Sequence, residues 1–237
     1  MITLAIDTCD RFGSVVTRVD GRPAGLQLHS GVEDYSSWLL PALESSLSEA
    51  RRTFADLDLL AVANGPGSFT AVRVGLSTVK ALAEVYEKRV VGVSRLQAMA
   101  GSVLGEGWIV ASYDAHRGQD FAALYRRFSG ELKLMEDQMV IAPAEFLAFV
   151  KQQTGTDPVR WISVDSETVA WPFSQAEVQT GKFQPIKSAP GLAIAVGALA
   201  EENAARGEFT DVPQLDANYV RRSDAEIYWK GPAYRGG

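Results

Sequence analysis

One segment of the sequence carries residue types that could hold a small anion: Gly65-Pro66-Gly67-Ser68-Phe69-Thr70, followed by Arg73 and Gly75. Glycines permit a tight turn, and Ser68 or Thr70 can satisfy open amides at a helix start, where an anion is also favoured. No Gly-Lys-Ser/Thr follows as in a Walker A loop, and Pro66 and Thr70 depart from the dinucleotide fingerprint. A structural turn with a helix cap is therefore the favoured interpretation, and a ligand loop is the alternative.

Histidine and cysteine residues offer little for metal or nucleophilic chemistry. The two histidines, His29 and His116, lie far apart in the chain and lack the spacing of a helical metal pair. We interpret each as a hairpin or loop residue at the surface. Cys9 is the only cysteine, and its place just after an apolar strand favours a small apolar filler over a nucleophile. The sequence therefore predicts no catalytic residue and no metal site.

The elements that must position these residues follow one order in both halves of the chain. Each half reads as three strands, a helix, a strand and a helix, and each opens on a strand that ends at an aspartate. The first half contains the patterns 4–8, 13–19, 25–30, 34–50, 57–63, 68–87, 90–93 and 95–104. The second half contains 108–113, 121–128, 132–141, 143–153, 161–164 and 189–206.

Two similar βββαβα halves predict an α/β protein with a duplicated actin-like, or ribonuclease-H-like, fold. We place the domain boundary after residue 104, which gives an N-terminal domain 1–104 and a C-terminal half 105–237. The stretch 171–190 has no clear pattern and is left unassigned.

The aspartates that end the two opening strands, Asp7 and Asp114, could face a ligand between the halves. In actin-like ATPases such aspartates face a nucleotide, and neighbouring glycine-rich hairpins wrap its phosphates with backbone amides. Here neither hairpin has closely spaced glycines, and Asp10 adds a repelling charge. Residual nucleotide binding at Asp7, Thr8, Asp114 and Gly118 is therefore the less favoured alternative, and we expect no independent ATP turnover.

The helical pattern 68–87 is apolar on two sides, although a helix on one sheet needs only one apolar face. One side carries Val72, Leu76, Val79 and Ala83, and the other carries Val74, Ala81, Leu82 and Val85. The second face predicts that another helix packs there, with the helix 34–50 as companion, whereas burial between the chain's own domains is the alternative. The predicted partner interface consists of Tyr35, Trp38, Leu39, Ala42, Leu43, Val72, Leu76, Val79 and Ala83.

The hexapeptide 65–70 with Arg73-Val74-Gly75 resembles the signature of the bacterial TsaB family, also called YeaZ. Further matches lie along most of the chain, at Leu4-Ala5-Ile6-Asp7-Thr8, Gly92-Val93-Ser94, Tyr113-Asp114-Ala115, Arg117-Gly118 and Tyr219-Val220-Arg221. The resemblance implies an actin-like fold and a role in threonylcarbamoyl modification of tRNA adenosine. The larger paralogue TsaD shares the hexapeptide but carries a metal-binding His-x-x-x-His pair, which this chain lacks.

The resemblance therefore implies a non-catalytic scaffold that pairs with TsaD through the two helices and works with the ATPase TsaE. It implies a homodimer when the chain is alone and only indirect contact with tRNA. We expect no cofactor, with ATP or ADP at the interface of the complex as the alternative. A free-standing actin-like ATPase or phosphotransferase is the rival function, and a metallopeptidase is a less favoured one.

Composition and charge exclude several other classes of protein. The 237 residues are 46% hydrophobic and 22% charged, which is typical of a globular chain and not of a disordered one. A formal net charge of −6 is unfavourable for binding the phosphate backbone of a nucleic acid without a partner. No basic n-region and no apolar stretch of membrane-spanning length is visible, so we expect a cytoplasmic protein with no membrane contact.

Overall fold

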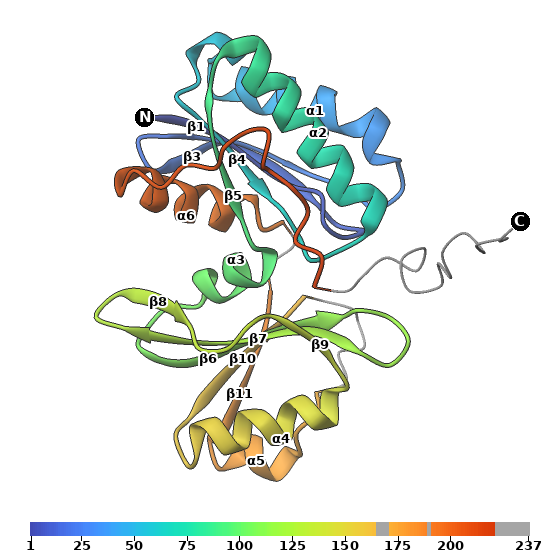
Figure 1. Ribbon diagram of the computed structural model, residues 1–237, viewed down its shortest axis with the longest axis vertical. Helices are drawn as coiled ribbons and strands as arrows, with labels where there is room; N and C mark the ends of the chain where they lie inside the picture. Colours follow the sequence, from blue (N-terminus) through green and yellow to red (C-terminus); the bar gives the residue numbers. More distant parts are fainter. Residues whose placement is uncertain (165–170, 189–190, 221–237) are drawn as a thin grey trace, which may run out of the picture.

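The computed structural model describes residues 1–164, 171–188 and 191–220. Two mixed β-sheets lie one above the other, and helices cover their faces (Figure 1). Among the described residues, no helix is both long and apolar enough to cross a membrane.

The first sheet has five strands in the order β3-β2-β1-β4-β5. These are β1 (Ile2–Asp7), β2 (Ser14–Val19), β3 (Arg22–Leu28), β4 (Leu59–Ala63) and β5 (Arg89–Val93). The first three strands run antiparallel, and β4 and β5 then continue parallel to β1. Every residue of β4 is buried, as expected for a central strand covered on both faces.

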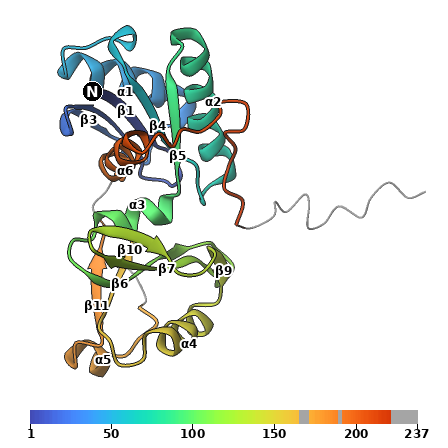
Figure 2. The ribbon, with the colours of Figure 1, turned by 60° about the vertical axis from the view of Figure 1, so that its left-hand side comes forward.

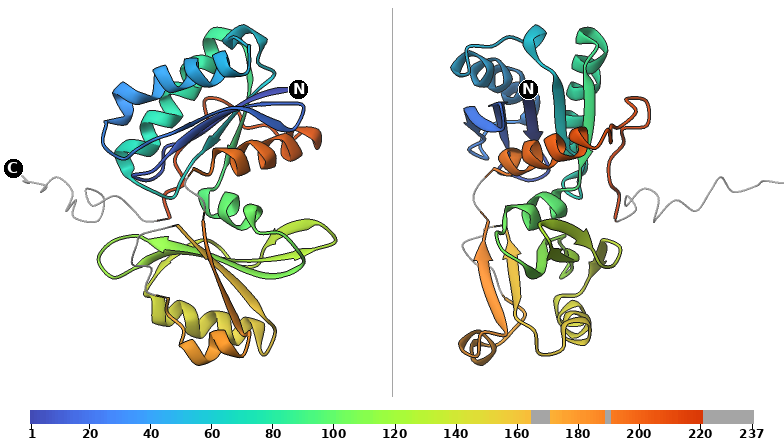
Figure 3. Two further views of the ribbon diagram at one scale, coloured as in Figure 1. Left: turned by 180° about the vertical axis from the view of Figure 1, so that it is seen from behind. Right: turned by 90° about the vertical axis from the view of Figure 1, so that its left-hand side faces the viewer.

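Helices α1 (Tyr35–Glu49) and α2 (Phe69–Tyr86) lie side by side on one face of this sheet, and α6 (Ala193–Ala205) covers the other (Figures 1 and 3). The short helix η1 (Phe54–Asp56) leads from α1 into β4. Apolar side chains of β1 and β4 fill the space between the helices, including Leu4, Ile6, Leu60 and Val62. The burial of these side chains supplies the main driving force for folding of this domain.

The second sheet has the order β11-β10-β6-β7-β8, and β9 pairs with β7. Its strands are β6 (Gly107–Asp114), β7 (Asp120–Phe128), β8 (Glu131–Leu134), β9 (Met139–Ile141), β10 (Val159–Ser163) and β11 (Phe183–Lys187). Helices α4 (Pro143–Thr154) and α5 (Gln175–Gln179) cover its outer face (Figure 1). Beneath them lies a separate aromatic core centred on Trp161 and Phe183. Helix α3 (Arg95–Ser102) lies between the two sheets (Figure 2).

The predicted α/β class and actin-like duplication are confirmed, because both sheets place the corresponding strands in the same order. Each half has the expected βββαβα order, followed by one more strand and helix. The second half differs in two details from the sequence patterns. The segment 132–141 forms two short strands, and β11 and α5 lie in the stretch 171–190, whose sequence has no clear pattern.

Helix α6 follows the second sheet in the sequence but packs on the first one. Its Glu201 forms a buried ion pair with Arg18 of β2, with Nε and Oε1 3.0 Å apart. A Cβ atom at Gly197 would lie only 2.4 Å from Cδ of Arg18, so glycine is what permits this close approach. The chain therefore passes between the two domains twice, first through α3 to β6 and again from β11 to α6.

Candidate functional site

The loop 65–70 is bonded to the end of β1 on one side and to α3 on the other. The backbone N–H of Ser68 donates to the carbonyl oxygen of Cys9 at 2.8 Å, and the N–H of Arg95 donates to that of Gly65 at 2.7 Å. A Cβ atom at Gly67 would lie 2.2 Å from the Cys9 oxygen, so a larger residue would separate loop and strand. Ser68 takes the N-cap position of α2, but its side chain accepts no capping hydrogen bond, contrary to the prediction.

The start of α2 is tied equally closely to β1. The hydroxyl of Thr8 donates to the carbonyl oxygen of Ala71 at 2.7 Å. A Cβ atom at Gly75 would lie 2.5 Å from the Thr8 hydroxyl oxygen. The small residues of the motif thus let the start of α2 and the end of β1 pack closely against one another.

Asp7 lies in a buried cluster of charges at the carboxyl end of β1. Its Oδ1 accepts a hydrogen bond from the N–H of Cys9 at 2.9 Å, and its Oδ2 lies 3.5 Å from Nε of Arg95. Arg95 also reaches Oδ2 of Asp10 at 3.4 Å. Burial, and then the charge of Asp7, raises the pKa of the Cys9 thiol well above its usual value. Cys9 therefore remains a neutral thiol, as expected for a core residue.

Tyr113, at the end of β6, joins this cluster from the second domain. Cζ of Arg95 lies 4.7 Å from the centre of the Tyr113 ring, and the Tyr113 hydroxyl donates to the carbonyl oxygen of Pro66. Burial raises the pKa of Tyr113, so its hydroxyl keeps its proton. The motif loop is thereby connected to both domains.

The residues considered for residual nucleotide binding have other partners in the first domain. The carboxylate of Asp7 faces the Arg95 guanidinium, and the hydroxyl of Thr8 is already used by Ala71. Asp114 is exposed in the second domain, where it accepts a hydrogen bond from the N–H of His116. Gly118 has a φ of +73° in the same turn and serves the turn geometry.

The two histidines lie in different surroundings. His29 is buried, which is contrary to the surface position predicted for it, and its ring stacks on Tyr35 with centres 4.3 Å apart. Both ring nitrogens lie within 2.9 Å of backbone carbonyl oxygens, those of Arg11 and Glu33. His116 is exposed in the β6–β7 turn. In the part of the chain that the structure describes, no three His, Cys, Asp or Glu side chains form a group that could hold a metal ion.

Most of the predicted partner-interface residues lie in the core of the first domain, so that part of the prediction is wrong. Leu39, Ala42, Leu43, Val72, Leu76, Val79 and Ala83 are all buried between the helices and the sheet. Tyr35 and Trp38 are half-buried and surround His29. The two apolar sides of α2 carry the same residue types, two valines, one leucine and one alanine each, so side-chain size gave no signal that could have distinguished the sheet-facing side.

The opposite side of α2, together with one residue of α1, faces outward. Val85 is 71% exposed and Leu40 of α1 is 51% exposed. Ala81 is also exposed, and Val74 and Leu82 are half-buried. We call these five residues the outer helical face. None of the five is charged, although Arg73 and Glu84 are also exposed on α2. Their side chains are small or medium in size, which suits close packing against another helix.

Phe69, Arg73 and Tyr219 form an exposed cluster at the start of α2. Cζ of Arg73 lies 3.6 Å from the centre of the Phe69 ring, and its Nε donates to the Tyr219 hydroxyl at 2.9 Å. The sequence pattern assigned Phe69 and Arg73 to the motif loop, but nothing in it placed Tyr219 beside them. The cluster fixes the segment after α6 against α2.

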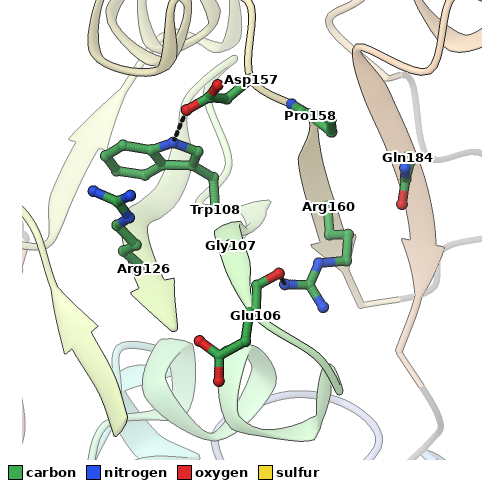
Figure 4. A pocket seen from close by; sticks show the side chains of 8 residues that line it. All are labelled: Glu106, Gly107, Trp108, Arg126, Asp157, Pro158, Arg160 and Gln184. Atoms are coloured by element: carbon green, nitrogen blue, oxygen red, sulfur yellow. Dashed lines mark hydrogen bonds between the residues drawn. The ribbon is translucent and has the colours of Figure 1, made fainter. Parts of the chain in front are cut away.

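A pocket of about 400 Å³ lies where β6 and β10 begin, at the end of these strands that is farther from Tyr113 (Figure 4). The Arg160 guanidinium donates to the carbonyl oxygens of Leu104, Gly105 and Glu106. Trp108 donates its indole N–H to Asp157 at 3.1 Å, and Arg126 lies over the indole ring. The polar groups of this pocket mainly bind one another, so they brace the turn that enters β6.

Comparison with known proteins agrees with this geometry. The family model "TsaD: tRNA N6-adenosine threonylcarbamoyltransferase" matches residues 30–229. The protein named TsaB in Bacillus subtilis is 28% identical over 97% of this chain and 98% of its own length. The Escherichia coli protein named TsaB is 29% identical over 73% of this chain and 74% of its own length. This chain belongs to the TsaB (YeaZ) family.

Solved structures support the fold of this TsaB family member. A Pseudomonas aeruginosa protein described as similar to peptidase YEAZ superposes with a TM-score of 0.74. It covers 93% of this chain and 99% of its own, at 23% sequence identity. At that identity the likeness concerns the fold alone, and it matches the two-sheet architecture of the TsaB family.

Proposed function

We propose that this chain takes part in tRNA threonylcarbamoyladenosine biosynthesis as a non-catalytic scaffold subunit. It binds a TsaD-type partner through the outer helical face. The names of the Bacillus subtilis and Escherichia coli relatives support the process, because both are called tRNA threonylcarbamoyladenosine biosynthesis proteins. The single observation that carries the scaffold role is the exposure of apolar side chains on the outer helical face, chiefly Val85 and Leu40.

The physical support comes from the cost of leaving such a face in water. Burying apolar surface contributes about 25 cal/mol per Å², so covering Val85 and Leu40 is favourable without any further chemistry. Exposed Ala81 and the neighbouring Ser77 have short side chains, which let a second helix approach closely. A partner that offers two helices of the same kind would complete a four-helix packing.

A non-catalytic role is supported by the way the ionisable groups of the motif region are engaged. Asp7 is paired with Arg95, Thr8 with Ala71, and Cys9 is a neutral buried thiol. None of these groups is poised to act as a base or a nucleophile. Catalysis, and most contact with tRNA, then belongs to the partner.

The remaining partners follow from the same surface. Without a TsaD-type subunit, the outer helical face pairs with a second copy of itself and gives a homodimer. A TsaE-type ATPase joins the assembled pair, and this chain by itself holds no cofactor. Any ATP or ADP bound by the complex lies at the interface between subunits.

The decisive experiment places charge on the outer helical face without disturbing the core. The double variant Ala81→Arg/Val85→Arg changes exposed positions only, so the monomer keeps its fold. We expect its affinity for the TsaD-type partner of the same organism, measured by calorimetry, to fall by about 100-fold or more. Leu104→Arg, at an exposed apolar position in the loop between α3 and β6, is the matched control and retains binding. Unchanged affinity of the double variant would refute the proposal.

A further inference from the structure

Arg95 is a buried cation at the junction of the two domains. It is the first residue of α3, the helix that lies between the two sheets (Figure 2). Its side chain is only 2% exposed, which is rare for arginine unless the charge is held by partners. Two different domains supply those partners.

The first domain supplies the negative charge. Nε of Arg95 lies 3.5 Å from Oδ2 of Asp7, and Nη1 and Nη2 each lie 3.4 Å from Oδ2 of Asp10. Asp7 is the last residue of β1 and Asp10 lies three residues after it, so both contacts hold the guanidinium to the first sheet.

The second domain supplies an aromatic face. The Tyr113 ring of β6 lies 4.7 Å from the guanidinium carbon, within the range of a cation–π contact. The hydroxyl of the same tyrosine donates to the Pro66 carbonyl oxygen in the first domain. Arg95 and Tyr113 together thus connect the two sheets across their junction.

The pairing depends on the junction staying dry. Nε and Nη1 of Arg95 and Oδ2 of Asp7 are buried and make no hydrogen bond, so the contact between these two side chains is ionic and not a hydrogen bond. Such attraction is strong in an interior of low dielectric constant and weak once water enters. If the domains separated, water would hydrate each charge and the connection would be lost as a unit.

We infer that Arg95 is an interdomain latch, a side chain that holds the two domains closed with no ligand between them. It occupies the place beside Asp7 where a bound cation or donor group would otherwise balance the carboxylate. The relative orientation of the domains is therefore set by the chain itself. This inference does not depend on the proposed partner.

The test measures the distance between the domains in the whole protein. Spin labels on Ser45→Cys in α1 and Gln152→Cys in α4 report that distance, because both positions are exposed and native Cys9 is buried. The double variant Asp7→Asn/Arg95→Met removes both charges and so leaves no buried ion unpaired. We expect its distance distribution to become longer and broader than that of the wild type. An unchanged distribution would overturn the latch.

A matched control removes another polar connection at the same junction. Gln138 accepts from Nδ2 of Asn218 at 2.8 Å and donates to Oγ of Ser94 at 2.7 Å. We expect Gln138→Ala to keep the closed distribution. Opening equal to that of the double variant would indicate general loosening of the junction and would also overturn the latch.

Chemical rescue separates a latch from a general role in folding. Arg95→Ala leaves space for a free guanidinium ion between Asp7 and Tyr113. Millimolar guanidinium chloride, compared with sodium chloride at equal ionic strength, is expected to return the distance distribution toward that of the wild type. Further opening in guanidinium would contradict the inference. If Arg95→Ala does not fold, the charge-free double variant decides the matter.

Discussion

Asp120 is a half-buried carboxyl group opposite Asp114 on the paired strands β6 and β7. Burial, and then the charge of Asp114, raises the pKa of Asp120 to about 6. A raised pKa means that the folded protein disfavours the charged form. The corresponding stability is fully present below the ordinary value of 3.8 and is lost as the pH rises through about 6.

Asp120→Asn is expected to remove this cost at neutral pH. The free energy of unfolding at pH 7.5 should increase by about 1 kcal/mol, a value reduced for the partial exposure of the group. Below about pH 3 the variant and the wild type should have equal stability, because the aspartate is then largely protonated in both folded and unfolded chains. Urea titrations at about pH 3 and pH 7.5 measure the difference. An equal gain at both pH values would contradict the assignment.

For individual residues, the sequence indicated which ones form the site but not which side chains contact one another. The motif 65–70 and Asp7 were identified from residue type and from their place after apolar strands. Their link to Arg95 and Tyr113 depends on how two distant strands meet α3, and no local pattern contains that information. The same holds for Tyr219, which reaches Arg73 from the far end of the chain.

At the scale of elements, α2 illustrates what periodicity can predict. The pattern 68–87 agrees with the observed helix, because apolar spacing and helix length are local properties. Which of its two apolar sides meets the sheet is decided by tertiary packing, so the interface predicted from the sequence falls on the core side. Strand β11 was missed since only one of its five residues is buried and Pro185 interrupts it.

Two side-chain truncations distinguish the core side of helices α1 and α2 from their outer side. Leu43→Ala removes a fully buried side chain of α1 and should lower the free energy of unfolding by about 2–5 kcal/mol. Val85→Ala removes exposed atoms and should change it by less than about 0.5 kcal/mol. Denaturant titration of both variants is the measurement. A small loss at Leu43 would mean that α1 is not packed on the sheet as described.

At the scale of the whole molecule, the N-terminal sheet is completed by a helix from the end of the chain. Helix α6 covers the face opposite α1 and α2, and the buried Arg18–Glu201 pair fixes it there (Figure 3). The predicted domain 1–104 contains one face of the sheet and its two helices but not this cover. Its apolar lower face would be open to water without α6.

The fragment 1–104 is therefore expected to lack a cooperative thermal transition. A chain in which a Gly/Ser linker joins 1–104 to 191–220 should recover it, because α6 again buries the open face. Circular dichroism melts of the two chains provide the comparison. A sharp transition in the fragment 1–104 alone would show that the sheet is stable without its distant helix.

The two passages of the chain between the domains limit how these bodies can move. An object fastened at a single point can swing in any direction, whereas one fastened at two points turns about the line through them. We therefore expect a separation of the domains to be mainly a rotation about the line that joins the two passages. In such a rotation the largest displacement falls on side chains farthest from that axis.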